Sequence, residues 1–344
     1  MTSDTPLTIQ AETRGRALFI DRKGSLYIAR KYRIFRSDDG GATWNLDCYV
    51  PTSGWKPVAS TFSLAARALR FNIQAFQVLA DGSRVAVARD GIYRAQAGES
   101  RMTRSWAVTR GSRPITLSAE GNRVFFGEYG GAEMDHVGVR VYLSEDGGRH
   151  FEPFFEFPKG DIHHIHNVVV DPYADHYWVL AGDHGRTPGI AALSKDGRHL
   201  DWLDRGHQMV RAVSVLPRPD HLIYGSDSEV EPNFLIRLDK KTAKWERLLP
   251  VEGSSLYAAD VNGMAVISTS VESSAVNTAR HCSLYASHDD ATWTRLVSLE
   301  KDLWSPILHF GLIVLPTVQD ASTRRWMFSG QALKRHHDRV SLCG

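Results

Sequence analysis

Cysteine is scarce in this sequence. Among 344 residues there are three cysteines, Cys48, Cys282 and Cys343, an odd number spread far apart along the chain. A chain of this length can bury enough apolar surface to be stable without covalent cross-links. The pattern excludes the disulfide framework of a small secreted domain and predicts free thiols in a reducing compartment.

An excess of charge of either sign is also missing. The 41 Lys and Arg side chains are balanced by 39 Asp and Glu side chains, which leaves a formal net charge of +2 at pH 7. No block of like charges occurs. Because nucleic acids and anionic membranes are bound mainly through basic surfaces, we expect neither as a partner.

Long apolar runs are absent too. Residues 307–318 come nearest, but they contain His309, Gly311 and Pro316 and are shorter than the roughly 18 residues that a transmembrane helix needs. The first residues, Met-Thr-Ser-Asp-Thr-Pro-Leu, lack the basic and apolar regions of a secretory signal. We therefore expect a cytoplasmic protein.

Glycine, aromatic residues and histidine are plentiful, with 28 Gly, 14 Phe, 11 Tyr, 9 Trp and 15 His. Short apolar segments alternate with Gly, Pro, Asn and Asp, and no segment sustains a 3.6-residue period. This pattern predicts an all-β chain.

One turn pattern recurs. It reads Ser-Asp-Asp-Gly-Gly-Ala-Thr-Trp at 37–44 and Ser-Glu-Asp-Gly-Gly-Arg-His-Phe at 144–151, with looser copies at 194–202 and 287–293. Asp and Ser side chains bind nearby backbone groups in such turns, and Gly adopts positive φ. The copies begin 107, 50 and 93 residues apart. These distances fit a unit of about 50 residues, of which the chain holds about seven.

The turn resembles the Asp-box, or BNR repeat, of sialidase-like β-propellers. The resemblance implies that each turn joins the third and fourth strands of a blade, away from the active site, with Trp44 and Trp293 buried beneath it. We expect one seven-bladed propeller domain over residues 1–344, with the ring closed by residues 6–11 pairing in the last blade. The expected blades span 14–50, 66–108, 109–158, 161–205, 206–250, 251–299 and 300–344.

Polar residues collect at the positions that this architecture places on the opposite rim. There the inner strands begin and the loops between second and third strands lie. The candidates are Arg70, Glu128, Tyr129, His164, His166, Asp183, His184, Gln208, Arg211, Asp227 and Glu272. Convergence of such groups is typical of an active site.

The histidines carry the strongest signal. His164 and His166 are two apart, so they share one face of a strand. With His184 they can hold a divalent metal such as Zn²⁺ or Ca²⁺. Alternatively, His164 and His166 act as a general base and a substrate clamp, or they are structural.

Tyr129 and Arg211 are the other candidates for chemistry. Tyr129 lies in a Gly-flanked loop, where it can act as an acid or base or pack on a neighbouring blade. Arg211, three residues after Gln208, can pair with a substrate carboxylate or form a salt bridge between blades.

Several segments look like those of bacterial BNR-repeat glycosyl hydrolases: 126–130, 164–173, 178–183, 208–211 and 270–273. That family is similar in architecture to sialidases and to seven-bladed polysaccharide lyases that act on uronate-containing glycans. Sialidases fit poorly, because their Arg-Ile-Pro motif is missing ahead of the first turn.

The function we predict is cleavage of an acidic, uronate-containing glycan, with β-elimination favoured over hydrolysis. In elimination, Arg211 or a His-bound cation neutralises the carboxylate, His164 or His166 is the base and Tyr129 is the acid. Hydrolysis needs two carboxylates, available among Glu128, Asp183, Asp227 and Glu272. A third alternative is a non-catalytic propeller that binds glycan or protein. In each case Arg70, Glu128, Asp183, Gln208, Arg211, Asp227 and Glu272 are assigned to substrate binding.

Overall fold

The computed structural model describes residues 7–51, 72–88, 90–304, 310–319 and 325–344. These residues form 29 strands and only two short 3-10 helices, η1 (Ala132–His136) and η2 (Gln208–Val210). The prediction of an all-β chain is therefore confirmed. Within the described part of the chain, no helix is long and apolar enough to cross a membrane.

The chain divides into two compact units. The first comprises Met1–Asn72, Asp227–Leu235 and Arg247–Gly344, and the second comprises Ile73–Ser226 and Ile236–Glu246. Two of the four divisions fall within strands β20 (Asn233–Asp239) and β21 (Trp245–Val251), and the other two follow Asn72 and Ser226.

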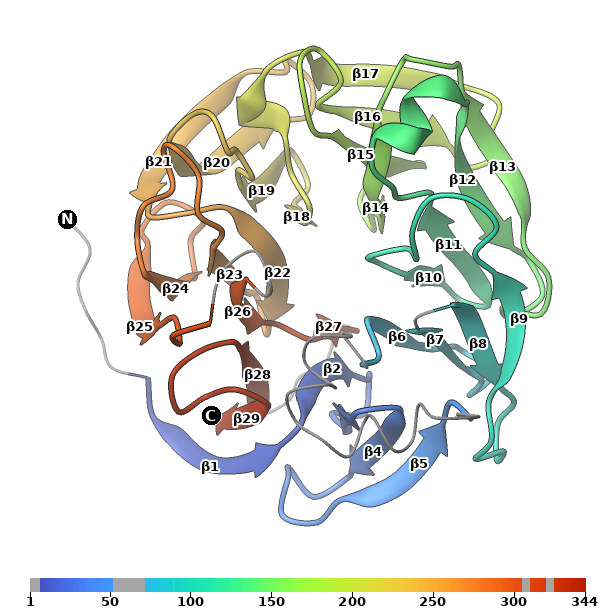
Figure 1. Cartoon of the computed structure of the whole chain (residues 1–344), viewed down its shortest axis with the longest axis vertical. Helices are drawn as coiled ribbons and strands as arrows, with labels where there is room; N and C mark the ends of the chain where they lie inside the picture. The colour runs from blue at the N-terminus through green and yellow to red at the C-terminus, as the bar shows by residue number, and fades with distance from the viewer. Residues whose placement is uncertain (1–6, 52–71, 89, 305–309, 320–324) are drawn as a thin grey trace. The chain divides into compact units, whose positions relative to one another are not determined.

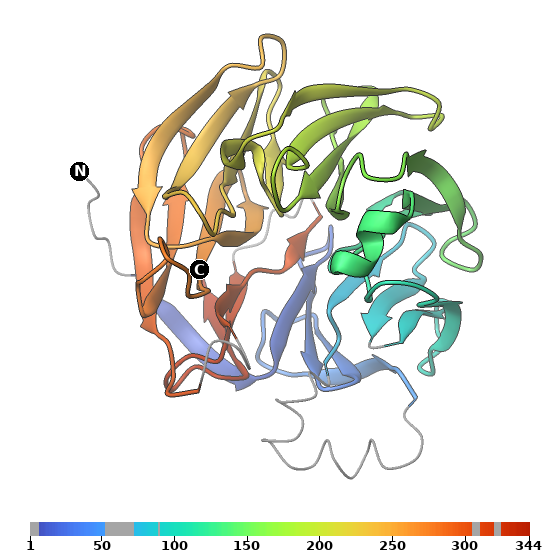
Figure 2. The same cartoon turned by 45° about the horizontal axis from the view of Figure 1, so that its top comes forward.

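The second unit contains three antiparallel sheets, each made of four consecutive strands (Figures 1 and 2). The first consists of β6 (Ala75–Val78), β7 (Arg84–Ala88), β8 (Gly91–Ala95) and β9 (Thr103–Ala107). The next consists of β10 (Ser118–Glu120), β11 (Arg123–Gly127), β12 (Val139–Ser144) and β13 (Glu152–Phe157). The third consists of β14 (His164–Val170), β15 (His176–Gly182), β16 (Gly189–Ser194) and β17 (Leu200–Arg205). Strands β18 (Val215–Pro217) and β19 (His221–Gly225) begin a further four-stranded sheet that continues into β20 and β21.

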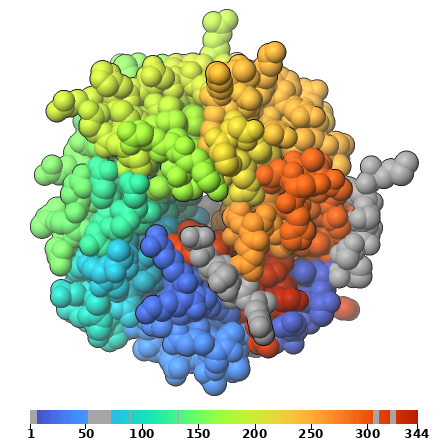
Figure 3. All heavy atoms as spheres, turned by 180° about the vertical axis from the view of Figure 1, so that it is seen from behind, coloured from blue at the N-terminus to red at the C-terminus, as the bar shows by residue number. Residues whose placement is uncertain are grey.

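Apolar side chains pack neighbouring sheets of this unit against each other. Val85 of β7 belongs to the same buried cluster as Phe126 of β11, and Phe125 belongs to the same cluster as Tyr177 of β15. Side chains of a strand alternate between its two faces, so the middle sheet can pack on both sides. In the space-filling view, the cyan to yellow-green segments of this unit form a continuous surface (Figure 3).

The first unit contains two larger sheets. One consists of β2 (Arg16–Ile20), β3 (Leu26–Arg30), β4 (Arg33–Ser37) and β5 (Asn45–Tyr49), with β27 (Thr317–Val318) added beside β2. The other has eight strands: β1 (Ile9–Arg14), β22 (Ser255–Val261), β23 (Met264–Val271), β24 (His281–Ser287), β25 (Thr294–Glu300), β26 (Gly311–Val314), β28 (Trp326–Gln331) and β29 (Arg339–Cys343).

The described residues thus form six sheets rather than the seven separate ones expected. The difference arises at β23, whose end extends beyond its own hairpins. There Ser270 pairs with Leu312 and Val271 with Gly311, so that β22–β25 merge with the strands that follow.

The N-terminal strand pairs with the last strand, as expected, but over different residues. Strand β1 runs antiparallel to β29 from Ile9 to Arg14 rather than over residues 6–11. Arg339 also forms an ion pair with Glu12 at 3.2 Å. This pairing lies within the first unit, and closure of the whole chain stays a prediction.

The four recurring turns join β4 to β5, β12 to β13, β16 to β17 and β24 to β25, which are third and fourth strands of consecutive runs. In each, a Ser hydroxyl lies 2.6–2.9 Å from an Asp carboxylate oxygen two residues later. In the first turn, hydrogen bonds from Thr43 and Ser37 hold the pKa of Asp39 well below its usual range. Trp293 is buried as predicted, but Trp44 is only half-buried, so the prediction for Trp44 is wrong.

A fifth turn differs from the four recurring ones. A turn between β20 and β21 is built on Asp239, which accepts hydrogen bonds from the backbone of Lys241 and Thr242. It lacks the Ser and Gly of the motif, which is why the sequence pattern missed it.

All three cysteines are free thiols, as predicted, and each of them is buried.

Candidate functional site

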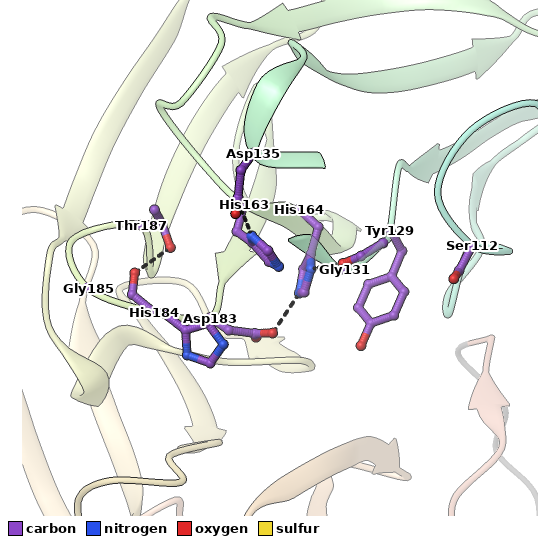
Figure 4. A pocket seen from close by; sticks show the side chains of 11 residues that line it. Ser112, Tyr129, Gly131, Asp135, His163, His164, Asp183, His184, Gly185 and Thr187 are labelled. Carbon is purple, nitrogen blue, oxygen red and sulfur yellow. Dashed lines mark hydrogen bonds and ion pairs between the residues drawn. The ribbon is translucent and has the colours of Figure 1, made fainter. Parts of the chain in front are cut away.

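A pocket of about 650 Å³ lies in the second unit (Figure 4). Its walls come from the β9–β10 and β11–β12 loops, the residues at the start of β14 and the β15–β16 loop. The residues that line it are Ser112, Tyr129, Gly130, Gly131, Asp135, His163, His164, Asp183, His184, Gly185 and Thr187. All of them belong to the second unit, so the pocket is described within that unit.

Strand β14 positions the first two histidines. The β14–β15 register shifts between Ile165 and Asn167, which leaves His166 at a β-bulge. Bulges redirect side chains and are common beside active sites. The β11–β12 loop is fixed to this strand because the Ile165 amide donates to the Glu128 carbonyl oxygen at 2.9 Å.

The two imidazoles face each other. The His164 Nδ1 lies 2.8 Å from the Gly130 carbonyl oxygen, and the His166 Nδ1 lies 2.9 Å from the Ala212 carbonyl oxygen. Their Nε2 atoms are 3.0 Å apart. Both side chains are buried, and burial lowers the pKa of His164.

Asp183, which directly follows β15, completes this cluster. Its Oδ1 lies 2.9 Å from the His166 Nε2, and its Oδ2 lies 3.2 Å from the His164 Nε2. Burial alone would raise the pKa of Asp183. Hydrogen bonds with the two histidines outweigh burial and hold this pKa far below its usual range. The carboxylate is therefore ionised at neutral pH.

Residues of the η2 region hold Asp183 from the other side. The Arg211 Nη2 lies 3.2 Å from Asp183 Oδ1, and the Gln208 side-chain amide donates to the Asp183 backbone oxygen at 3.1 Å. Gln208 is buried, and its Oε1 has no hydrogen-bond partner among the described residues. Both residues thus reach the site through Asp183, as groups that position it.

His163 and Asp135 were missed by the sequence analysis. The His163 Nδ1 lies 2.5 Å from Asp135 Oδ1, so the ring donates this proton to the carboxylate and keeps Nε2 as its acceptor. His163 precedes β14, and the alternation rule therefore did not apply to it. The signal that could have revealed it is the uninterrupted His163-His164 pair at a strand start.

Tyr129 and His184 complete the pocket. The Tyr129 ring centroid lies 4.3 Å from that of His164, and the His163 centroid lies 4.8 Å from His164 on its other side. Figure 4 shows His164 between the other two rings. His184 is exposed, and its ring lies 5.9 Å from that of His163.

The groups that could hold a metal ion differ from the one predicted. His163, His164 and Asp183 place one ligand atom each within 4.8 Å of one another, and His166 also contacts Asp183. No such group within the second unit's described residues includes His184. Asp183 was predicted only to bind substrate, and metal binding by His164, His166 and His184 stays a prediction.

Among the predicted substrate-binding residues of the second unit, Asp183 lines the pocket, whereas Glu128, Gln208 and Arg211 do not. Glu128 is buried, and its carboxylate accepts hydrogen bonds from Arg110 and from the Arg140 amide, so it is a structural ion-pair partner. Asp227 and Glu272 belong to the first unit. Arg70 lies outside the described residues.

Gly182 is required for the histidine cluster to fit. A Cβ atom at this position would lie 2.3 Å from the His166 Cε1. We therefore expect Gly182→Ala to cost about 1–3 kcal/mol of unfolding free energy through overpacking. The measurement is denaturant unfolding of Gly182→Ala and of the double variant with His166→Ala. The alanine at 182 should cost almost nothing once the ring is gone. An equal cost in both backgrounds would contradict this close contact.

Comparison with known proteins informs the fold alone. The sequence matches no family model and no curated protein. The structure is similar to a chain of the crystal structure of the mitotic checkpoint complex, with a TM-score of 0.62 and 8% identity over 100% of this chain and 96% of that chain. It is also similar to the extracellular domain of a protein described as a one component system of B. thetaiotaomicron. There the TM-score is 0.54 and the identity 12%, over 99% of this chain and 39% of that chain. With the succession of small antiparallel sheets, these likenesses define an all-β protein of the β-propeller type.

Proposed function

We propose that this protein is a carbohydrate-active enzyme that cleaves an acidic, uronate-containing glycan by β-elimination. One observation carries the proposal: the pocket presents a histidine oriented by a carboxylate, His163 with Asp135, and a tyrosine, Tyr129, on the two sides of His164. A base held by a third group, with a second proton-transfer residue in the same pocket, is the arrangement that acid–base catalysis needs.

The reaction assigns one proton to each residue. The His163 Nε2 removes the proton on C5 of the uronate, and the electron pair of that C–H bond forms the C4–C5 double bond. The bond between C4 and the glycosidic oxygen breaks, and the departing oxygen takes the Tyr129 hydroxyl proton. Proton transfer from His163 back to Tyr129 through solvent restores both groups. No oxidant or other co-reactant is needed.

This assignment replaces the bases expected from the sequence. The Nε2 atoms of His164 and His166 contact each other and Asp183. In His163, Asp135 binds Nδ1, which leaves Nε2 as the atom that can accept a proton. Tyr129 keeps its predicted role as the acid. The Arg211 charge is offset by Asp183, which favours a bound cation as the group that neutralises the uronate carboxylate.

Hydrolysis is the second candidate, and one observation favours it. Two carboxylates, Asp135 and Asp183, line the same pocket. Glycoside hydrolases use such a pair, with one group protonating the leaving oxygen. Both carboxylates are, however, already bound to histidines, which makes elimination the better-supported reaction.

A panel of uronate-containing glycans tests the proposal. Elimination creates a conjugated double bond, so ultraviolet absorbance should rise together with the number of reducing ends. Reducing ends without absorbance would identify a hydrolase. Binding of a glycan without either signal would identify a non-catalytic propeller and would overturn the enzymatic proposal.

The finer architecture is also proposed here: seven Asp-box blades closed into one ring. The eight-stranded sheet consists of two four-stranded runs: β22–β25, and β26 with β28, β29 and β1. Two residue pairs between β23 and β26 join these runs, which supports counting them as two blades. A closed ring predicts one compact particle with a radius of gyration of about 20 Å. Small-angle X-ray scattering measures this radius, and a clearly larger value would contradict a closed ring.

A further inference from the structure

The histidine pair has an unusual proton arrangement. Carbonyl oxygens only accept hydrogen bonds, so the contacts of His164 Nδ1 with Gly130 and of His166 Nδ1 with Ala212 place a proton on both Nδ1 atoms. Without a second proton or a bound cation, each ring then has a lone pair on Nε2, and the contacts of these atoms with Asp183 require one or the other. These two lone pairs point at one another across 3.0 Å.

The Asp183 carboxylate adds two more acceptors to the same point. Its oxygens lie 2.9 Å from the His166 Nε2 and 3.2 Å from the His164 Nε2. The two histidine side chains are 2% and 3% exposed. The Asp183 side chain is 15% exposed. Four acceptor atoms that face each other at a largely buried point repel unless a positive centre lies between them. The Arg211 Nη2 lies 3.2 Å from one of the four, Asp183 Oδ1.

We infer that His164, His166 and Asp183 bind one divalent transition-metal cation, with Zn²⁺ as the best match. Tetrahedral ligands about 2.0–2.1 Å from a zinc ion lie roughly 3.3 Å apart, close to the spacings of this set. Each histidine donates its other ring proton to a backbone carbonyl, the usual support of a metal-bound imidazole. Two nitrogen donors favour zinc over calcium or magnesium, which prefer oxygen ligands.

Three protein ligands leave a coordination position for a substrate. His164 and Asp183 line the pocket, so a substrate bound there would lie beside the ion. The presence of the ion does not depend on the reaction, but its role rests on the proposed function. When bound, the cation would supply a Lewis acid for the uronate carboxylate. His163 and Tyr129 would perform the proton transfers beside it.

Metal binding is tested without any substrate. The wild-type protein is treated with EDTA, dialysed and titrated with Zn²⁺ by calorimetry, and its bound metal is counted by elemental analysis. We expect about one equivalent of zinc, and at saturation a rise in melting temperature of about 5 °C. Calcium should produce neither effect.

Variants locate the site. Asp183→Asn keeps the side-chain size but removes the charge, and this variant should no longer bind zinc tightly. We expect the same loss of zinc binding in His166→Ala. His163→Ala and the exposed turn variant His199→Ala should keep it. Should a ligand variant fail to fold, the visible spectrum of wild-type protein loaded with Co²⁺ reports low-coordinate nitrogen ligation without any substitution.

If the wild-type protein binds no zinc ion tightly, the inference is wrong, and the two imidazoles share a proton instead. Unchanged affinity in a folded Asp183→Asn, or loss of the ion in His163→Ala, would overturn the ligand set. Because these readouts are independent of turnover, a bound zinc without lyase activity refutes only the proposed reaction. Lyase activity without zinc refutes only this inference.

Discussion

Replacing His163 by alanine is expected to lower kcat on a uronate-containing glycan by about 10²–10⁴-fold, because the variant has no group in place to take the C5 proton. The KM should change little, since the pocket walls around Tyr129 and His164 remain. The measurement is steady-state kinetics from ultraviolet absorbance, with circular dichroism to establish that the variant folds.

Two variants sharpen this result. Asp135→Asn should reduce kcat to a similar extent, because an amide no longer stabilises the charged ring and its NH₂ group can hold His163 in the tautomer without an Nε2 lone pair. His199→Ala removes an exposed histidine of the β16–β17 turn and should keep the wild-type rate. A wild-type rate in folded His163→Ala would remove this residue from the mechanism.

The second large effect concerns stability at Glu128. This side chain is 4% exposed, whereas its partner Arg110 is 27% exposed. Arg110→Ala leaves a buried carboxylate without its counter-charge, and we expect it to cost about 3–5 kcal/mol of unfolding free energy. Glu128→Gln should cost less, because the remaining guanidinium can reach water.

Denaturant unfolding measures both variants and their combination. Arg110→Ala with Glu128→Gln should be more stable than Arg110→Ala alone, since the second substitution removes the stranded charge. If the two single variants cost the same, or if the double variant is the least stable, the buried ion pair does not work as described. In that case the assignment of Glu128 as structural would have to be revised.

The Glu128 case shows where sequence reasoning reaches its limit. A Gly-flanked Glu-Tyr pair is typical of a binding loop, and Tyr129 does line the pocket. The partner that turns Glu128 inward, Arg110, lies in a different segment 18 residues away. Nothing in a local pattern indicates that pairing.

The turns were the most predictable part of the fold. Each depends on a Ser hydroxyl and an Asp carboxylate two residues apart, an interaction confined to a few neighbouring residues. Local interactions of this kind are visible in a sequence. The merger of two sheets at Ser270 and Val271 was not visible in the sequence, because it depends on a strand that extends beyond its hairpin.

The candidate site was predictable in part. The spacing of His164 and His166 brought both residues into one hypothesis, and the structure places their Nε2 atoms 3.0 Å apart. The bulge at His166 and the contacts of both rings with backbone carbonyls could not be foreseen. The sequence analysis grouped the exposed His184 with this pair, whereas the structure places the Asp183 carboxylate beside it.

The most direct test of the central claim is mass spectrometry of the products released from a defined uronate oligosaccharide. Elimination predicts one fragment lighter than the corresponding hydrolysis product by a single water, with the new double bond at its non-reducing end. The same fragment should be missing after incubation with His163→Ala. Fragments that all carry the added water, or an intact oligosaccharide after prolonged incubation with the zinc-loaded protein, would contradict the account.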